Sequence, residues 1–140
     1  IFLSGDSILP RISPNISVWP AEPEADPLLD FMETLNEFAR RMPADVTVLP
    51  AHDAPFTGFH NRLADLAEHH RQRLTVLEEA MTGRPLTAWD TVSVLFRPGM
   101  DPQQMSFALG EAIAHARRLV AEDRAVLEKP ADGPWRYHRR

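Results

Sequence analysis

The sequence predicts an α/β fold in its first part and a helical domain with a terminal hairpin in its second. Two short apolar runs, residues 1–3 and 46–49, are typical of buried strands, and an amphipathic helix separates them. That order indicates an α/β layer. Three more helical segments and a pair of short strands follow. We therefore expect two domains, over residues 1–58 and 59–140.

The helix of the first part has clear start and stop signals. Asp26 is a favourable N-cap, Pro27 suits the first helical position, and Pro43 ends the helix. A long proline-rich loop precedes it and contains Asn15 and Trp19. These two side chains are candidates for lining a substrate pocket, or for packing the loop onto the sheet. The predicted apolar face of the helix comprises Leu28, Phe31, Met32, Leu35, Phe38 and Ala39.

The second part has the element order of a winged helix. A long helix is expected over about residues 60–81, and Gly83 and Pro85 break the pattern after it. Thr87 caps a short helix, with Asp90 at the reciprocal position of a capping box. A third helix opens at Asp101 and Pro102. The end of the chain predicts a hairpin, with strands at 125–129 and 135–137 around a turn at 130–134.

Composition excludes several classes of protein. The 140 residues include no cysteine, so disulfides and thiolate-bound zinc are excluded. No apolar run approaches the roughly 18 residues of a membrane span, and we expect a cytoplasmic protein without a membrane partner. The net charge of −5 argues against a dedicated nucleic-acid binder. Because the chain opens on Ile1 inside a predicted strand, we expect it to be a fragment.

Two polar residues lie just past the ends of the two predicted strands of the first part. Asp6 comes after the first strand and His52 after the second. Ligand sites in α/β sheets form beyond the carboxyl ends of the strands. Zinc accepts both carboxylate and imidazole, and a two-metal site needs a bridging oxygen ligand. An aspartate after glycine is also a common turn residue, so the residues alone leave a metal site and ordinary loop residues both open.

The surroundings of these two residues resemble the metallo-β-lactamase superfamily. The segment 3–6 ends in Gly5 and Asp6, and the segment 48–53 contains His52 after Pro50. In that superfamily one strand ends in Gly-Asp and a later one in Pro-Gly-His-Gly. This sequence differs at Ala51 and Asp53, where glycine is usual, and Ser7 stands where histidine is frequent. The resemblance implies the C-terminal half of an αββα sandwich.

The resemblance extends to the end of the chain. From residue 60 onward the sequence is similar to the winged-helix tail of the glyoxalase II-like branch that contains β-lactamase-like protein 2. The matching features are His60 with Asn61, residues 69–73, Thr87 with the helix toward Phe96, His115, and residues 135–137. The fold expected on this basis is the second half of the sandwich followed by a winged-helix-like domain.

The resemblance also implies a function and a set of ligands. Asp6 would bridge two zinc ions and His52 would bind one of them. The family's His-x-His-x-Asp-His signature is absent from this sequence, so the remaining ligands and the water-activating residues are expected upstream of Ile1. The N-terminal half of the same fold is then the partner, and the fragment alone is expected to lack activity. The implied reaction is hydrolysis of a thioester, lactone or related ester.

The other histidines and arginines have less specific interpretations. His60 is interpreted as a substrate contact or, preferably, a helix cap. His70 falls on an apolar helical stripe and is expected to be a packed core histidine, whereas His69 and His115 are expected at the surface or an interface. Arg71 and Arg73 are interpreted as part of a solvated face.

Two alternatives to the esterase-type hydrolase remain at this stage. The first is a metal-dependent endoribonuclease. The winged helix and the basic residues Arg136, Arg139 and Arg140 favour it, but the negative net charge of the chain argues against it. The second is a winged-helix interaction module without catalysis, for which a homodimer is one form of association. Salt-dependent RNA affinity would favour the former, and metal-independent self-association the latter.

Overall fold

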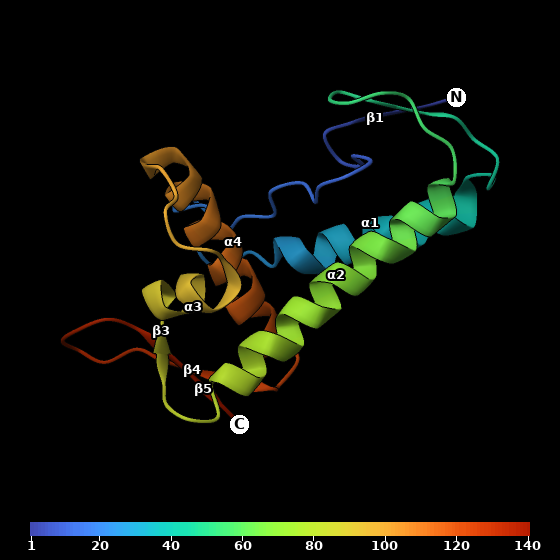
Figure 1. The fold of residues 1–140 in the computed structure, drawn as a ribbon. Coiled ribbons are helices and arrows are strands. Elements are labelled where there is room, and N and C mark those ends of the chain that lie inside the picture. The colour runs from blue at the N-terminus through green and yellow to red at the C-terminus, as the bar shows by residue number, and fades with distance from the viewer. The chain divides into compact units, whose positions relative to one another are not determined.

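The observed elements follow the predicted order (Figure 1). The computed structural model describes residues 1–140. Every predicted helix and strand is present, and one short strand, β3, was not predicted. The elements are β1 (Phe2–Gly5), α1 (Pro27–Arg41), β2 (Val48–Pro50), α2 (Phe59–Ala80), β3 (Leu86–Thr87), α3 (Ala88–Leu95), α4 (Pro102–Ala121), β4 (Ala125–Glu128) and β5 (Arg136–Arg139).

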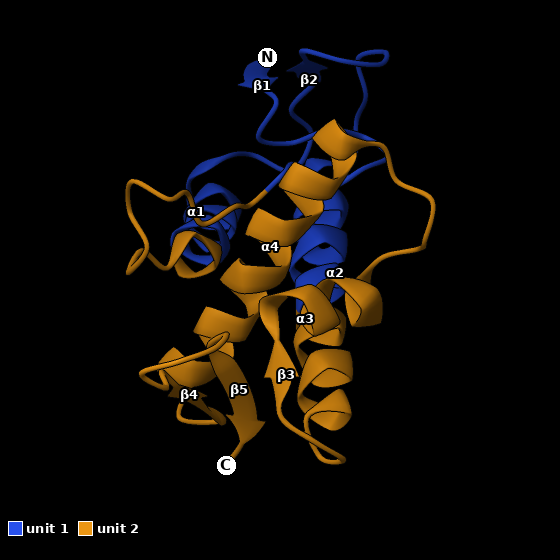
Figure 2. Cartoon of the chain, turned by 90° about the vertical axis from the view of Figure 1, so that its left-hand side faces the viewer, with its two compact units in different colours: residues 1–15, 30–70 blue, residues 16–29, 71–140 orange.

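The chain divides into two compact units (Figure 2). Unit 1 consists of residues 1–15 and 30–70, and unit 2 of residues 16–29 and 71–140. Each unit therefore contains two separate stretches of the sequence. The domain boundary expected between residues 58 and 59 stays a prediction.

Unit 1 is built around a two-stranded parallel sheet. Phe2 pairs with Val48 and Leu3 with Leu49 across β1 and β2. The rings of Phe2, Phe38 and Phe59 pack together, with Phe2 5.1 Å from Phe38 and 5.0 Å from Phe59 between centroids. The buried side chains of this core are Ile8, Leu35, Val46, Val48, Phe59, Leu63, Leu66 and Ala67.

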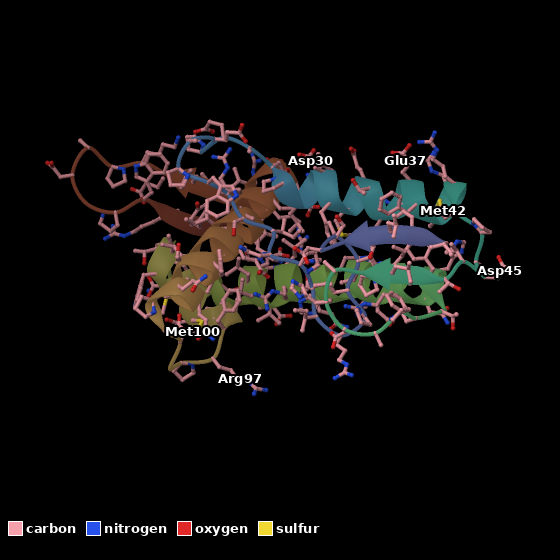
Figure 3. All side chains as sticks on the ribbon, turned by 90° about the horizontal axis from the view of Figure 1, so that it is seen from above. Asp30, Glu37, Met42, Asp45, Arg97 and Met100 are labelled. Carbon is pink, nitrogen blue, oxygen red and sulfur yellow. The ribbon has the colours of Figure 1, made fainter.

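Helix α1 is amphipathic, as its sequence pattern predicts. Leu35 is buried in the unit 1 core, and Phe31 and Phe38 pack against that core. Figure 3 shows Asp30 and Glu37 projecting from the outer side of α1, and both side chains are exposed. The helix thus covers one side of the core and presents carboxylates to water.

Strand β1 is less buried than the sequence predicts. Ser4 is buried, but Leu3 is 78% exposed and Ile1 is 86% exposed. The expectation of a buried strand was wrong for this chain, because no other part of the chain covers the face of β1 on which Leu3 lies. An apolar strand with an open face normally packs against further structure.

Unit 2 contains two well-capped helices and a small antiparallel sheet. Thr87 and Asp90 form the predicted capping box of α3, and Asp101 forms a second one with Gln104 at the start of α4. Val92 of α3 packs against buried alanines of α4. The sheet has the order β3-β5-β4, in which β5 pairs antiparallel with both neighbours.

The segment 16–29 packs closely on α4. The Val18 N–H donates to the Gly110 carbonyl at 3.1 Å. A Cβ at Gly110 would lie 2.6 Å from Ser17 Oγ, so only glycine admits this approach. Further along the segment, Arg118 of α4 pairs with Asp26 at 2.8 Å. These contacts explain why half of the proline-rich loop belongs to unit 2.

None of the helices combines the length and the apolar character needed to cross a membrane.

Candidate functional site

The parallel pairing of β1 and β2 places Asp6 beside His52. The two strands end at Gly5 and Pro50, which are partners across the sheet. The Ala51 N–H donates to the Gly5 carbonyl at 2.9 Å and extends the pairing by one step. The following side chains therefore emerge at the same edge, and His52 Nε2 lies 3.3 Å from Asp6 Oδ1. The structure thus brings together the two residues that the sequence predicted as ligands.

The backbone on either side of the pair is locally unusual. Gly5 has a φ of +54° and Asp53 a φ of +68°, both in the left-handed region. Glycine adopts this conformation freely, and aspartate is among the few other residues that tolerate it. Two backbone hydrogen bonds between Val48 and Phe56, of 2.8 and 3.1 Å, close the loop that carries His52. The tolerance of aspartate for a positive φ explains how Asp53 occupies a position where the metallo-β-lactamase superfamily usually has glycine.

The pair is open to solvent. The Asp6 side chain is 69% exposed and the His52 side chain 72% exposed. A pair this exposed contributes little to stability, so folding energy gives no reason for the two groups to be adjacent. A carboxylate oxygen and an imidazole nitrogen are both zinc ligands. They fit part of a metal site, since tetrahedral zinc takes four ligands and this edge supplies two.

The other predicted site residues lie in different places. Asn15 is exposed in unit 1, and Trp19 is 54% exposed in unit 2, where it lines an apolar groove. His60 Nε2 lies 2.8 Å from the carbonyl oxygen of Met42, just after α1, so it does not cap its own helix. A substrate-lining role for these residues stays a prediction.

The buried histidines match the sequence expectation only in part. His70 is fully buried, with Nε2 3.0 Å from Ser13 Oγ and its ring edge-on to Phe31, as expected for a core histidine. His115 is also fully buried, and its Nδ1 lies 2.8 Å from the Glu111 carbonyl oxygen. The expectation of a surface position was wrong, because α4 is buried around more of its circumference than its aliphatic stripe suggests. Ala112, Ala114 and Ala116 are fully buried beside it.

The prediction that Arg73 belongs to a solvated face was also wrong. Its side chain is 16% exposed, and Nη2 lies 3.3 Å from Glu111 Oε1. The guanidinium lies 4.4 Å from the ring centroid of Phe96. Burial raises the pKa of Glu111 and lowers the pKa of Arg73, so each charge partly offsets the cost of burying the other. The sequence contained one indication that Arg73 is covered, because Arg73 lies seven residues after Leu66 and hence on the apolar face of the helix.

Comparison with known proteins shows likenesses to one family. Residues 74–140 match the family described as metallo-β-lactamase-like, C-terminal domain. These residues are therefore similar in sequence to a metallo-β-lactamase-like C-terminal domain, and the mixed α/β fold of the whole chain is similar to part of a solved metallo-β-lactamase family protein.

Two solved structures are similar over nearly the whole chain. A β-lactamase domain protein from Burkholderia ambifaria is 42% identical with a TM-score of 0.93, and a metallo-β-lactamase family protein from Thermus thermophilus is 32% identical with a TM-score of 0.80. Each alignment covers 99% of this chain, but the chain spans only 42% and 41% of the two solved proteins. No curated protein matches the sequence.

Proposed function

We propose that this chain is the C-terminal part of a metal-dependent hydrolase with a dinuclear zinc site. The observation that carries the proposal is the 3.3 Å approach of Asp6 and His52 at the ends of two paired strands. The resemblance to a metallo-β-lactamase C-terminal part supports it, because hydrolysis at a metal site is the general activity of that family. The substrate class that we propose is an ester, thioester or lactone.

Within this proposal Asp6 and His52 hold the metal. Asp6 would be the bridging ligand, and His52 would be a terminal imidazole ligand. Bound zinc supplies a water of lowered pKa and polarises the substrate carbonyl. The contribution of the chain is positional, because the Ala51–Gly5 hydrogen bond and the left-handed Gly5 and Asp53 fix where the two ligands emerge.

The N-terminal half of the fold is the partner that we propose for unit 1. The exposed Leu3 of β1 and the exposed Ile1 just before it support this, since a strand of this type is normally covered on both faces. The greater length of the two solved relatives supports it as well. We expect the 140 residues alone to bind metal weakly and to show no hydrolysis, because two ligands do not fix a coordination geometry.

We also propose a winged-helix arrangement for unit 2 and a place in the glyoxalase II-like branch. The order α2, α3, α4, β4 and β5, with β5 in the centre of a three-stranded sheet, supports the winged helix. The net charge of −5 favours a small-molecule substrate over RNA. A cytoplasmic location completes the proposal.

The test measures zinc content and hydrolysis on the full-length protein that contains this chain. We expect about two zinc ions per chain, as a two-metal site requires. Asp6→Ala and His52→Ala should each weaken zinc binding by more than the roughly 10–100-fold that loss of an outer-shell partner causes. Zinc affinity is measured by competition with a chromogenic chelator, and ester and thioester hydrolysis is measured beside it.

Asp45→Ala is the matched control, because Asp45 is an exposed carboxylate of unit 1 outside the proposed ligand set. This variant should retain zinc content and activity. Wild-type zinc affinity in both ligand variants would contradict the proposal, and so would a full-length protein that binds no metal.

A further inference from the structure

We infer that unit 2 carries a second binding site, an apolar groove that takes an amphipathic carboxylate such as a fatty acid. The groove has a volume of about 920 Å³ and lies entirely within unit 2. Its wall comes from the segment 17–23, the start of α3, one side of α4, and the end of the β4–β5 hairpin. Its lining includes Trp19, Trp89, Trp135, Leu109, Ile113 and Arg117.

Three tryptophans give the groove its apolar character. Trp19, Trp89 and Trp135 come from three separate stretches of sequence, and they are 54%, 60% and 47% exposed. They are the only tryptophans of the chain. Large aromatic side chains are normally covered, and a contiguous exposed apolar surface marks an interaction or ligand site. The convergence of all three indoles on one concavity therefore indicates a bound apolar group.

One face of helix α4 forms part of the groove lining. Leu109 and Ile113 of α4 line the groove, and the close approach of Ser17 to Gly110 holds the segment 17–23 against this helix. The volume lies at the upper end of the roughly 300–1,000 Å³ typical of ligand pockets. An extended acyl chain or a comparable apolar body fits such a space.

The charged groups at one end of the groove are complementary to an anion. Arg117 is the charged residue in the lining, and its side chain is only 18% exposed. Its Nη2 donates to the carbonyl and the carboxylate of Glu24 at 3.0 and 2.9 Å. Lys129 lies 3.5 Å from the same carboxylate and 4.2 Å from the ring centroid of Trp135. Two cations thus face one carboxylate at this end of the groove.

Glu24 is the group that a ligand carboxylate would displace. Its side chain is 68% exposed, so its release to water is inexpensive. A carboxylate on an acyl chain would take over the Arg117 hydrogen bonds while its apolar part covers the indoles. A nucleic acid fits less well, because the groove wall offers a single cation. The groove contains neither Asp6 nor His52, so ligand binding there is independent of the proposed hydrolase function.

The experiment is a fluorescence titration of the 140-residue chain with decanoate and with decanol, both below the concentration at which they form micelles. All tryptophan emission reports on the groove. We expect a saturable blue shift with both probes and tighter binding of decanoate. Arg117→Met should weaken decanoate binding about 10-fold or more, the size of a lost hydrogen bond to a charged group, and leave decanol binding unchanged. Glu24→Gln should tighten decanoate binding by removing the competing carboxylate.

Arg136→Met is the matched control, because Arg136 is an exposed arginine of the same sheet and does not line the groove. It should bind both probes like the wild type, and circular dichroism should show that each variant is folded. A titration without a saturable shift would overturn the inference, as would equal decanoate affinity in wild type and Arg117→Met. A blue shift that depends on protein concentration without any probe would identify a second copy as the occupant, and would overturn it too.

Discussion

Each of the two units contains an acid–base pair at 3.3 Å, and the two pairs differ sharply in their exposure to water. In unit 1 Asp6 and His52 have about 70% of each side chain exposed. In unit 2 only 12% of the Glu111 side chain and 16% of the Arg73 side chain are exposed. An exposed pair is worth about 0–1 kcal/mol, whereas breaking a buried pair costs about 3–5 kcal/mol. The first pair therefore contributes little to stability and the second contributes substantially, while a metal-binding role of the first pair stays a proposal.

The largest expected effect comes from breaking the buried pair. Glu111→Gln leaves the Arg73 guanidinium buried without its counter-charge, and we expect the free energy of unfolding to fall by about 3–5 kcal/mol. The measurement is urea denaturation followed by circular dichroism. The double variant Arg73→Met with Glu111→Leu should recover most of the loss, because it removes both buried charges.

A loss below about 1 kcal/mol in Glu111→Gln would mean that water reaches this pair, as it does the exposed pair of unit 1. The contrast between the two units would then be wrong.

An intermediate effect is expected at Asp90, whose side chain is 25% exposed. Hydrogen bonds from Arg84, and then from the Thr87 hydroxyl and N–H, hold the pKa of Asp90 well below its usual range. Because the folded pKa is lowered, the stabilisation is complete above the unfolded pKa of about 3.9 and is lost as the pH falls toward the folded value. Asp90→Asn should cost about 1 kcal/mol at pH 7, the size of a helix cap.

The check is urea denaturation of wild type and Asp90→Asn at pH 7, 4 and 2.5. The difference between the two proteins should shrink as the pH falls below 4. A difference that is the same at all three pH values would show that the cap does not depend on the Asp90 charge.

The smallest effect on stability is expected at the exposed pair. Asp6→Asn should change the free energy of unfolding by less than about 1 kcal/mol, because the interaction with His52 is screened by water. Denaturation of the metal-free chain measures this directly. A loss comparable to that of Glu111→Gln would assign the pair a structural role and weaken the proposal that it holds a metal.

Much of the fold was predictable because its signals are local. The capping boxes at Thr87 and Asp101, the proline at the start of α1 and the turn of the terminal hairpin act over about three to five residues. The adjacency of Asp6 and His52 was predictable for a similar reason, since paired parallel strands end at one edge. The roles of Asn15, Trp19 and His60 as substrate-lining residues stay predictions.

The tertiary structure alone decided how far each side chain is covered. Leu3 is apolar yet exposed, and His115 and Arg73 are polar yet covered, because burial depends on which segments pack on a given face. The same holds for the tryptophan groove, whose three indoles lie far apart in the sequence and meet only in the fold. Local hydrogen bonds and periodicity depend on neighbouring residues and can be recognised in the sequence. Long-range packing depends on the whole chain at once and is decided only in the fold.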